Sequence, residues 1–246
     1  AVSGDTNMLE LIIPSPASVI SITVMGVAFG LVLSLAKMKL KVEHDPRLEP
    51  LVEALPGANC GACGQPGCRG YAVKILEEGL PINLCVVGGA ESLEKISKIM
   101  GIEAEAQKPR IARVHCHGDC EVTRLKFLYA GPRSCAAAQQ IRDGFKVCHF
   151  GCLGLGDCER SCPFDAIHIN DKGLPVVDRD KCTGCGNCVA ACPRGIISLE
   201  EERFDVHVMC RNTEKAPVMK KGCSVGCIAC ARCVKACREV FAENPE

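Results

Sequence analysis

The sequence predicts an α+β fold in which one membrane-spanning helix precedes several small, cysteine-rich modules. Two observations support this prediction. An uncharged apolar tract lies near the N-terminus, and the 21 cysteines of the 246-residue chain gather in short runs behind it. The chain has no tryptophan and only seven phenylalanines, so a large aromatic core is not expected. Bound metal is therefore expected to supply much of the folding free energy of these modules, as in other small metallo-domains.

The first element is a helix expected at about residues 17–36, within an anchor region that covers 1–45. The tract carries no charged residue, and about 20 apolar residues span a bilayer as a helix. A signal peptide has positive charges before its apolar stretch, whereas here three lysines follow it: Lys37, Lys39 and Lys41. The positive-inside rule then predicts a single-pass protein of the cytoplasmic membrane, with its N-terminus outside and its modules in the cytoplasm. The lipid bilayer is one expected partner.

A cytoplasmic location decides between two uses of so many cysteines. Disulfides are rare in that reducing compartment, which leaves metal ligation as the expected use. The run Cys182-x2-Cys185-x2-Cys188-x3-Cys192-Pro193 specifies the metal group. In bacterial ferredoxins this spacing binds [4Fe–4S] clusters, with the last cysteine ligating a second cluster. Zinc is the alternative, but zinc sites usually combine two separated pairs of ligands.

A two-cluster ferredoxin-like domain is expected over 146–202. An earlier cysteine run also ends in Cys-Pro, and residues 166–169 and 174–177 flank an Asn-Asp-Lys-Gly turn, which predicts a β-hairpin between the runs. In crossed ligation, Cys162 would join the cluster of Cys182, Cys185 and Cys188. The other cluster would use Cys192 together with three cysteines of the earlier run: Cys148, Cys152 and Cys158. Cys148 enters this set as the nearest substitute, because Leu155 occupies the usual middle cysteine position.

A separate four-cysteine [4Fe–4S] module is expected over 46–105. Its ligands would be Cys60, Cys63, Cys68 and Cys85, since four thiolates complete one site. Glycines 61, 64 and 67 allow the backbone to turn tightly around a bound group. Short helices are expected at 71–78, where Ala72, Ile75 and Leu76 share one face, and at 91–100.

The remaining cysteines have less regular surroundings. A connecting region is expected over 106–145 and a partial second ferredoxin-like module over 203–246, which is either truncated or completed locally. Four cysteines with ferredoxin spacing belong to the partial module: Cys227, Cys230, Cys233 and Cys237. Five further cysteines could ligate another cluster or be buried free thiols, which are common in protein cores: Cys116, Cys120, Cys135, Cys210 and Cys223. The expected total is at least three [4Fe–4S] clusters and up to five.

Several functions are disfavoured by what the sequence lacks. It contains no Gly-x-Gly-x-x-Gly after a strand and no P-loop, so no nucleotide site is expected on this chain. Lys plus Arg equals Asp plus Glu at 29 each, and this balance shows no nucleic-acid footprint. No catalytic residues stand out. Arg194 and Lys181, beside the cysteine runs, could help an acidic protein to dock.

The order of modules resembles a known family. An N-terminal membrane helix, the Cys60-Gly-x-Cys63-Gly-x2-Gly-Cys68…Cys85 module and a ferredoxin module together resemble the B subunit of the Rnf (Rsx) complex, an ion-translocating ferredoxin:NAD oxidoreductase. The resemblance implies a subunit of a redox-driven translocase with A, C, D, E and G subunits, coupled to Na⁺ or H⁺ transport. It implies that this chain relays electrons between soluble ferredoxin and membrane-embedded redox subunits, without a catalytic site of its own.

Two other functions remain as alternatives. One is the iron–sulfur subunit of a different membrane oxidoreductase, such as a formate dehydrogenase type, although the module at 46–105 argues against it. The other is a cluster-based redox sensor, which would need one exposed cluster and not several in series.

Overall fold

The computed structural model describes residues 16–39, 45–204 and 206–243. The chain divides into two compact units, Ala1–Asp45 and Pro46–Glu246, and each is described by itself. Lys41, one of the three lysines behind the predicted membrane orientation, lies outside the described residues.

The N-terminal unit contains the long apolar helix α1 (Pro16–Lys39). It is long and apolar enough to cross a membrane, with a mean hydropathy of 2.4, and none of its side chains is buried within the protein. Two of its polar side chains are satisfied locally, because Ser21 Oγ and Thr23 Oγ1 donate hydrogen bonds to the carbonyls of Ser18 and Val19 at 2.9 and 2.8 Å. Such a helix presents apolar side chains on every face, as a membrane span requires.

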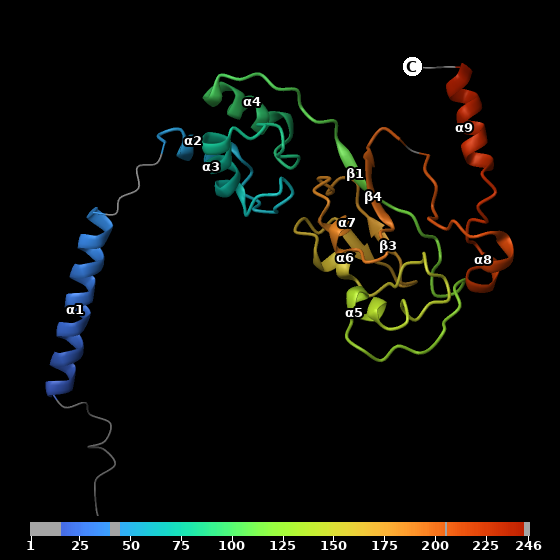
Figure 1. Ribbon diagram of the computed structural model, residues 1–246, viewed down its shortest axis with the longest axis horizontal. Coiled ribbons are helices and arrows are strands. Elements are labelled where there is room, and N and C mark those ends of the chain that lie inside the picture. The colour runs from blue at the N-terminus through green and yellow to red at the C-terminus, as the bar shows by residue number, and fades with distance from the viewer. Residues whose placement is uncertain (1–15, 40–44, 205, 244–246) are drawn as a thin grey trace, which may run out of the picture. The chain divides into compact units, whose positions relative to one another are not determined.

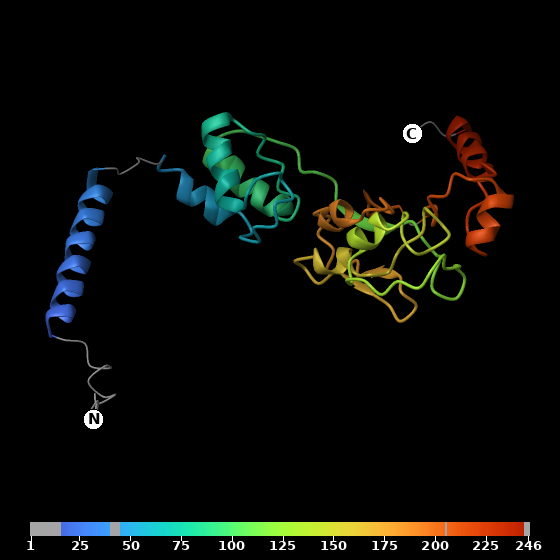
Figure 2. The same cartoon turned by 60° about the horizontal axis from the view of Figure 1, so that its bottom comes forward.

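The second unit begins with a three-helix module, visible in both views of the ribbon (Figures 1 and 2). Helix α2 (Leu48–Ala54) packs against α3 (Cys68–Glu78) and α4 (Gly89–Met100). The expected helices at 71–78 and 91–100 are therefore confirmed, each with an earlier start. Their apolar faces form a separate core around the fully buried Leu51, Tyr71 and Ile96. The Tyr71 hydroxyl donates to the Pro81 carbonyl at 2.6 Å and accepts from Leu84 N–H at 3.2 Å, which fixes the segment before Cys85.

The following module contains two antiparallel strand pairs (Figure 1). The expected hairpin is confirmed as β2 (Ile167–Ile169) and β3 (Pro175–Val177). The other pair joins β1 (Arg110–Val114) to β4 (Ile197–Glu201), with Val114 opposite Ile197. Strand β1 comes from the region expected to be a connection, so the ferredoxin-like fold starts well before residue 146.

Short helices carry the cysteine runs of this module. They are α5 (Cys135–Gln140), α6 (Asp157–Arg160) and α7 (Asn187–Ala191), and α6 packs against α7. The core combines β-strand residues such as Ile167 and Ile197, and the neighbouring Ile196, with buried cysteines. Helices α8 (Ala216–Gly222) and α9 (Arg232–Glu243) follow toward the C-terminus.

Candidate iron–sulfur centres

All 21 cysteines are free thiols, and 16 of them lie in four groups of four. We number the groups by position. Group 1 is Cys60, Cys63, Cys68 and Cys85; Group 2 is Cys162, Cys182, Cys185 and Cys188; Group 3 is Cys135, Cys152, Cys158 and Cys192; Group 4 is Cys116, Cys148, Cys210 and Cys223.

Group 1 lies on a glycine-rich loop and on the turn before α4. Asn59 Oδ1 accepts a hydrogen bond from Cys68 N–H at 2.9 Å, which closes the loop at the start of α3. Gly67 has a φ of 100°, and a Cβ there would stand 2.7 Å from Asn59 Oδ1, so the closure requires glycine. Burial raises the pKa of the Cys85 thiol, and the nearby thiols of the other three members raise it further. The structure therefore brings together the four residues expected for this module.

Group 2 joins Cys162 to the three cysteines of the later run, as crossed ligation predicts. These four thiols line one cavity between β1, β4 and α7. Burial, followed by the neighbouring thiols, raises the pKa of Cys188 to about 11. The loop that carries Cys185 needs Gly184, because its φ is 68° and a Cβ would overlap the Arg110 carbonyl. Backbone N–H groups of Ala112 and Ala166 point at the sulfurs of Cys182 and Cys162, at 3.5 and 3.4 Å.

Group 3 differs from the expected set in one member. Cys152, Cys158 and Cys192 line a cavity whose fourth thiol is that of Cys135. Cys148, expected here, lies instead in the cavity of Group 4. The reason is the position of α5, which places Cys135 beside the Group 3 cavity although it is distant from the other members in the sequence. Burial and then the Cys135 thiol raise the pKa of Cys158 to about 12.

Asp157 positions Cys135 within Group 3. Its carboxylate accepts hydrogen bonds from Ser134 Oγ at 3.1 Å and from Ala136 N–H at 2.9 Å, which ties the N-terminus of α5 to α6. Burial raises the pKa of the Asp157 carboxyl, but these hydrogen bonds and one from Cys135 N–H bring it below its usual value. The carboxylate is therefore ionised at neutral pH and holds α5 in place. No cysteine spacing in the sequence signals this contact.

Group 4 collects residues from four separate segments. Cys116 and Cys210 face each other in an isolated antiparallel bridge, and Cys223 follows α8. Burial raises the pKa of the Cys148 thiol, and the thiols of the other three members raise it further. The four side chains line one cavity together with Met219 and Phe150.

Five cysteines remain outside the four groups. Cys120 is exposed, and so are Cys230, Cys233 and Cys237 on or next to α9, while Cys227 is half-buried. Among the described residues, the four cysteines of the expected partial module do not line any of the three cavities of Groups 2 to 4: Cys227, Cys230, Cys233 and Cys237. Arg194, expected to face a docking partner, instead points inward and donates a 3.3 Å hydrogen bond to the Cys148 carbonyl.

The thiols of these groups are not arranged compactly enough for a single ion. A tetrahedral zinc has Zn–S bonds of about 2.3 Å and so needs sulfurs about 4 Å apart. Among the described residues, no group of three or more His, Cys, Asp or Glu side chains is that compact.

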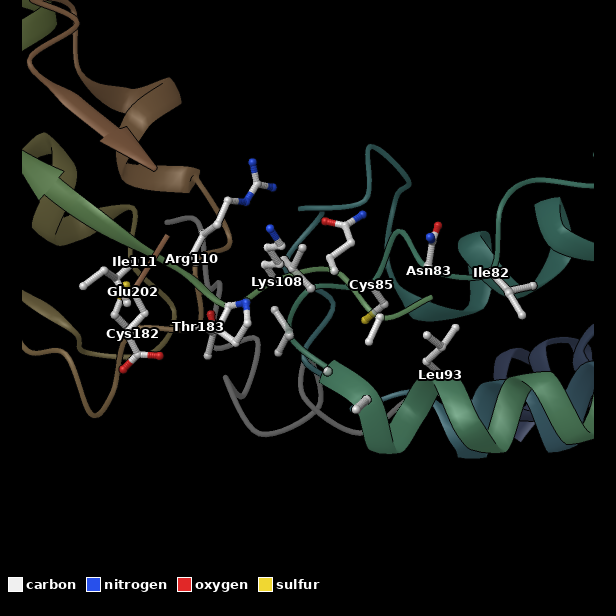
Figure 3. A pocket seen from close by; sticks show the side chains of 18 of the residues that line it. Ile82, Asn83, Cys85, Leu93, Lys108, Arg110, Ile111, Cys182, Thr183 and Glu202 are labelled. Carbon is white, nitrogen blue, oxygen red and sulfur yellow. The ribbon is translucent and has the colours of Figure 1, made fainter. Parts of the chain in front are cut away.

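Neighbouring groups touch one another along the second unit. Asn187 Nδ2, next to Cys188 of Group 2, donates a 3.2 Å hydrogen bond to the carbonyl of Cys60 in Group 1. A cavity of about 370 Å³ is lined by both Cys85 and Cys182, and Figure 3 shows Lys108 and Thr183 between them. Group 3 adjoins Group 2, because the thiol of Cys188 contributes to the raised pKa of Cys158, after burial and the Group 3 thiols.

Family models and known proteins resemble this chain. A family model described as an Fe-S cluster matches residues 55–87, and one described as a 4Fe-4S binding domain matches 175–198. The B subunit of the Na⁺-translocating ferredoxin:NAD⁺ oxidoreductase complex of Acetobacterium woodii is 45% identical over 83% of this chain and 61% of its own length. The proton-translocating counterpart from Clostridium ljungdahlii is 42% identical, over 83% of this chain and 72% of its own.

A third relative is archaeal. The B subunit of the ion-translocating oxidoreductase complex of Methanosarcina acetivorans is 38% identical, over 87% of this chain and 81% of its own length. The chain thus spans less than two thirds of the Acetobacterium protein and more of the other two.

Fold and site together define an iron–sulfur protein with ferredoxin-type [4Fe–4S] sites and an N-terminal apolar helix. Within that class, the chain belongs to the B-subunit family of the Rnf ion-translocating oxidoreductase complexes.

Proposed function

We propose that this chain is the electron-transfer subunit of a membrane ion-translocating ferredoxin:NAD⁺ oxidoreductase. It relays electrons between soluble ferredoxin and the membrane-embedded redox subunits, and the complex couples this transfer to Na⁺ or H⁺ transport. Groups 1, 2 and 3 each hold a [4Fe–4S] cluster. The observation that supports the proposal best is that these groups adjoin one another in the order 1, 2, 3.

The residues of the chain have three tasks in this function. The twelve thiols of Groups 1 to 3 provide sites of one chemical kind, and a [4Fe–4S] cluster bound to four thiolates accepts and releases one electron. Backbone N–H groups such as those of Ala112 and Ala166 point at the sulfurs, an arrangement that tunes reduction potentials. The buried walls around Groups 2 and 3, which include Ile167 and Ile197, exclude water and set the local dielectric.

The apolar helix provides the attachment to the membrane. Helix α1 spans the bilayer once, with the N-terminus outside and the modules in the cytoplasm, because Lys37 and Lys39 end the helix on the cytoplasmic side. The A, C, D, E and G subunits are the expected partners in the membrane. Group 1 follows the anchor in the sequence and is placed to exchange electrons with them.

The test removes one ligand from the middle of the series. Cys188→Ala in the assembled complex should abolish electron transfer from reduced ferredoxin to NAD⁺, because Group 2 separates Group 1 from Group 3. Cys120→Ala is the matched control, since Cys120 is exposed and belongs to none of the four groups. Folding and the spectrum of Group 1 must stay intact in both variants.

The outcome also separates this function from the alternatives. A normal ferredoxin:NAD⁺ rate in Cys188→Ala would reject the relay. Copurification with a soluble target, and not with membrane redox subunits, would support a sensor.

A further inference from the structure

Group 4 is a site that neither the cysteine motifs nor the two matched domains cover. Its members lie outside residues 55–87 and 175–198, and they do not form a short run in the sequence. We propose that Cys116, Cys148, Cys210 and Cys223 ligate an additional [4Fe–4S] cluster, next in line after Group 3. The binding site itself does not depend on the proposed function, whereas its place in the electron path rests on it.

The first argument is the convergence of four thiols in one cavity. Cys116, Cys148 and Cys223 are buried, and Cys210 is half-buried. A single buried thiol is an ordinary core residue. Four free thiols that line one cavity are instead the ligand set of a metal group, because metal ligation stabilises their deprotonated forms.

The second argument is the set of N–H groups that point at the sulfurs. Gly118 N–H and Cys152 N–H approach the Cys116 sulfur at 3.4 and 3.3 Å, and Cys227 N–H approaches the Cys210 sulfur at 3.4 Å. Groups 2 and 4 share this arrangement of backbone donors around thiols. Such donors stabilise the negative charge of thiolate ligands and tune cluster potentials.

The third argument is the positive charge of a buried lysine and a half-buried arginine beside Groups 3 and 4. Lys146 is only 4% exposed, and its ammonium group donates a hydrogen bond to the Gly118 carbonyl at 3.2 Å. The guanidinium of Arg194 lies among the thiols of Cys148, Cys152 and Cys192, and it binds the Cys148 carbonyl. Buried cations need nearby negative charge. Two thiolate-ligated clusters, each with a net negative charge, would provide it.

The position of Group 4 follows from a direct contact with Group 3. The N–H that approaches Cys116 of Group 4 belongs to Cys152 of Group 3. Transfer of one electron from the site of Group 3 to that of Group 4 would oxidise the first by one electron and reduce the second by one electron. The series of groups then runs 1, 2, 3, 4 through the second unit.

The test counts metal in the full-length chain, purified without oxygen. Cys148→Ala, Cys223→Ala and Cys210→Ala are compared with Cys120→Ala for iron, acid-labile sulfide and zinc per chain. Each Group 4 variant should lose about four irons and about four sulfides, as one cubane cluster requires, while Cys120→Ala should keep the full content. Cys210 is half-buried in a single bridge, so its replacement disturbs packing least.

Two results would overturn the assignment. One is an iron content equal to that of Cys120→Ala in a Group 4 variant that keeps its fold. The other is the loss of one zinc in place of iron. The position in the series is tested separately by the magnetic interaction between reduced clusters, which broadens the EPR spectrum. Loss of Group 4 should sharpen the signal of Group 3, and an unchanged signal would reject their adjacency. Neither readout requires ferredoxin or NAD⁺, so failure here is distinct from failure of the proposed function.

Discussion

Single contacts decide which thiols share a site in this protein. Cys135 and Cys148 are both candidates for the place left by Leu155, and the Asp157 carboxylate resolves the choice by holding the first turn of α5. Cys148 lies instead in Group 4, because its carbonyl binds Arg194 and its thiol faces Cys223. A carboxylate that accepts several N–H bonds is a strong local constraint. As a result, Group 3 contains Cys135 in place of the expected Cys148, and Cys148 belongs to Group 4.

The first prediction separates these two cysteines. Cys135→Ala should lose about four irons, the content of Group 3, because its cluster then lacks one of four ligands. The double variant Cys135→Ala, Cys148→Ala should lose about eight, since the two thiols serve different sites. Iron and sulfide per chain are measured against Cys120→Ala. If the double variant loses no more than either single variant, both cysteines belong to one cluster.

The second prediction concerns the half-buried guanidinium of Arg194. Burial lowers the pKa of Arg194, whereas the thiols of Cys148, Cys152 and Cys192 raise it. Arg194→Met removes a positive charge that favours the reduced state, so the potentials of Groups 3 and 4 should fall by on the order of tens of millivolts. Redox titration followed by EPR measures the shift. Arg203→Met, at an exposed position, is the control, and equal potentials in the two variants would contradict the prediction.

Among the elements, the three-helix module has the most complete structure of its own. Its buried core residues all come from 48–96, and its four thiols lie on its own loops. The hydroxyl of Tyr71, 1% exposed, bridges Pro81 and Leu84 and so joins the core to the segment that carries Cys85. The contact of Cys60 with Asn187 adds one hydrogen bond from the next module. The core and the four thiols of this element therefore come from its own residues.

The third prediction follows from this independence. A fragment of residues 46–105 should fold after anaerobic reconstitution and bind about four irons. Far-UV circular dichroism and iron analysis are the measurements, with Cys85→Ala in the same fragment as the control. A colourless fragment with helical circular dichroism would show that Group 1 needs the second module to bind its cluster.

The molecule as a whole joins a membrane anchor to a series of thiol groups. Helix α1 exposes Ile20, Phe29 and Leu33 on all sides, which suits lipid and not water. Groups 1 to 4 adjoin one another within the unit Pro46–Glu246. Four sites of one chemical kind, each in contact with the next, suit one-electron steps along a path.

The fourth prediction concerns orientation. Exposed thiols such as Cys120, Cys230 and Cys233 should react with a membrane-impermeant maleimide only after the cells are permeabilised, because the proposed orientation puts the modules in the cytoplasm. A Ser3→Cys variant should be labelled in intact cells, since the same proposal puts the N-terminal tail outside. Mass spectrometry of the labelled peptides distinguishes the sites. Labelling of Cys120 in intact cells would reverse the orientation.

Local patterns in the sequence are sufficient for the apolar helix, Groups 1 and 2, the hairpin and the helices α3 and α4. Each depends on residues that are close in the chain: an uncharged tract, cysteines three apart, or a turn between two β-branched runs. Cys162 is the one distant member, and its Cys-Pro ending marks it as a ligand of the second cluster. Chemistry that depends on short spacings can be predicted from the sequence.

Strand β1, the fourth member of Group 3 and all of Group 4 arise from contacts between distant segments. Cys116 lies opposite Cys210 because β1 pairs with β4, and the segments that follow these two strands pair again in an isolated bridge. Cys135 reaches Cys158 because Asp157 binds the start of α5. Neither contact has a fixed sequence separation, since loop closure costs little more free energy for a long loop than for a short one. These sites can be identified only from the tertiary structure, because side-chain packing decides which thiols face the same cavity.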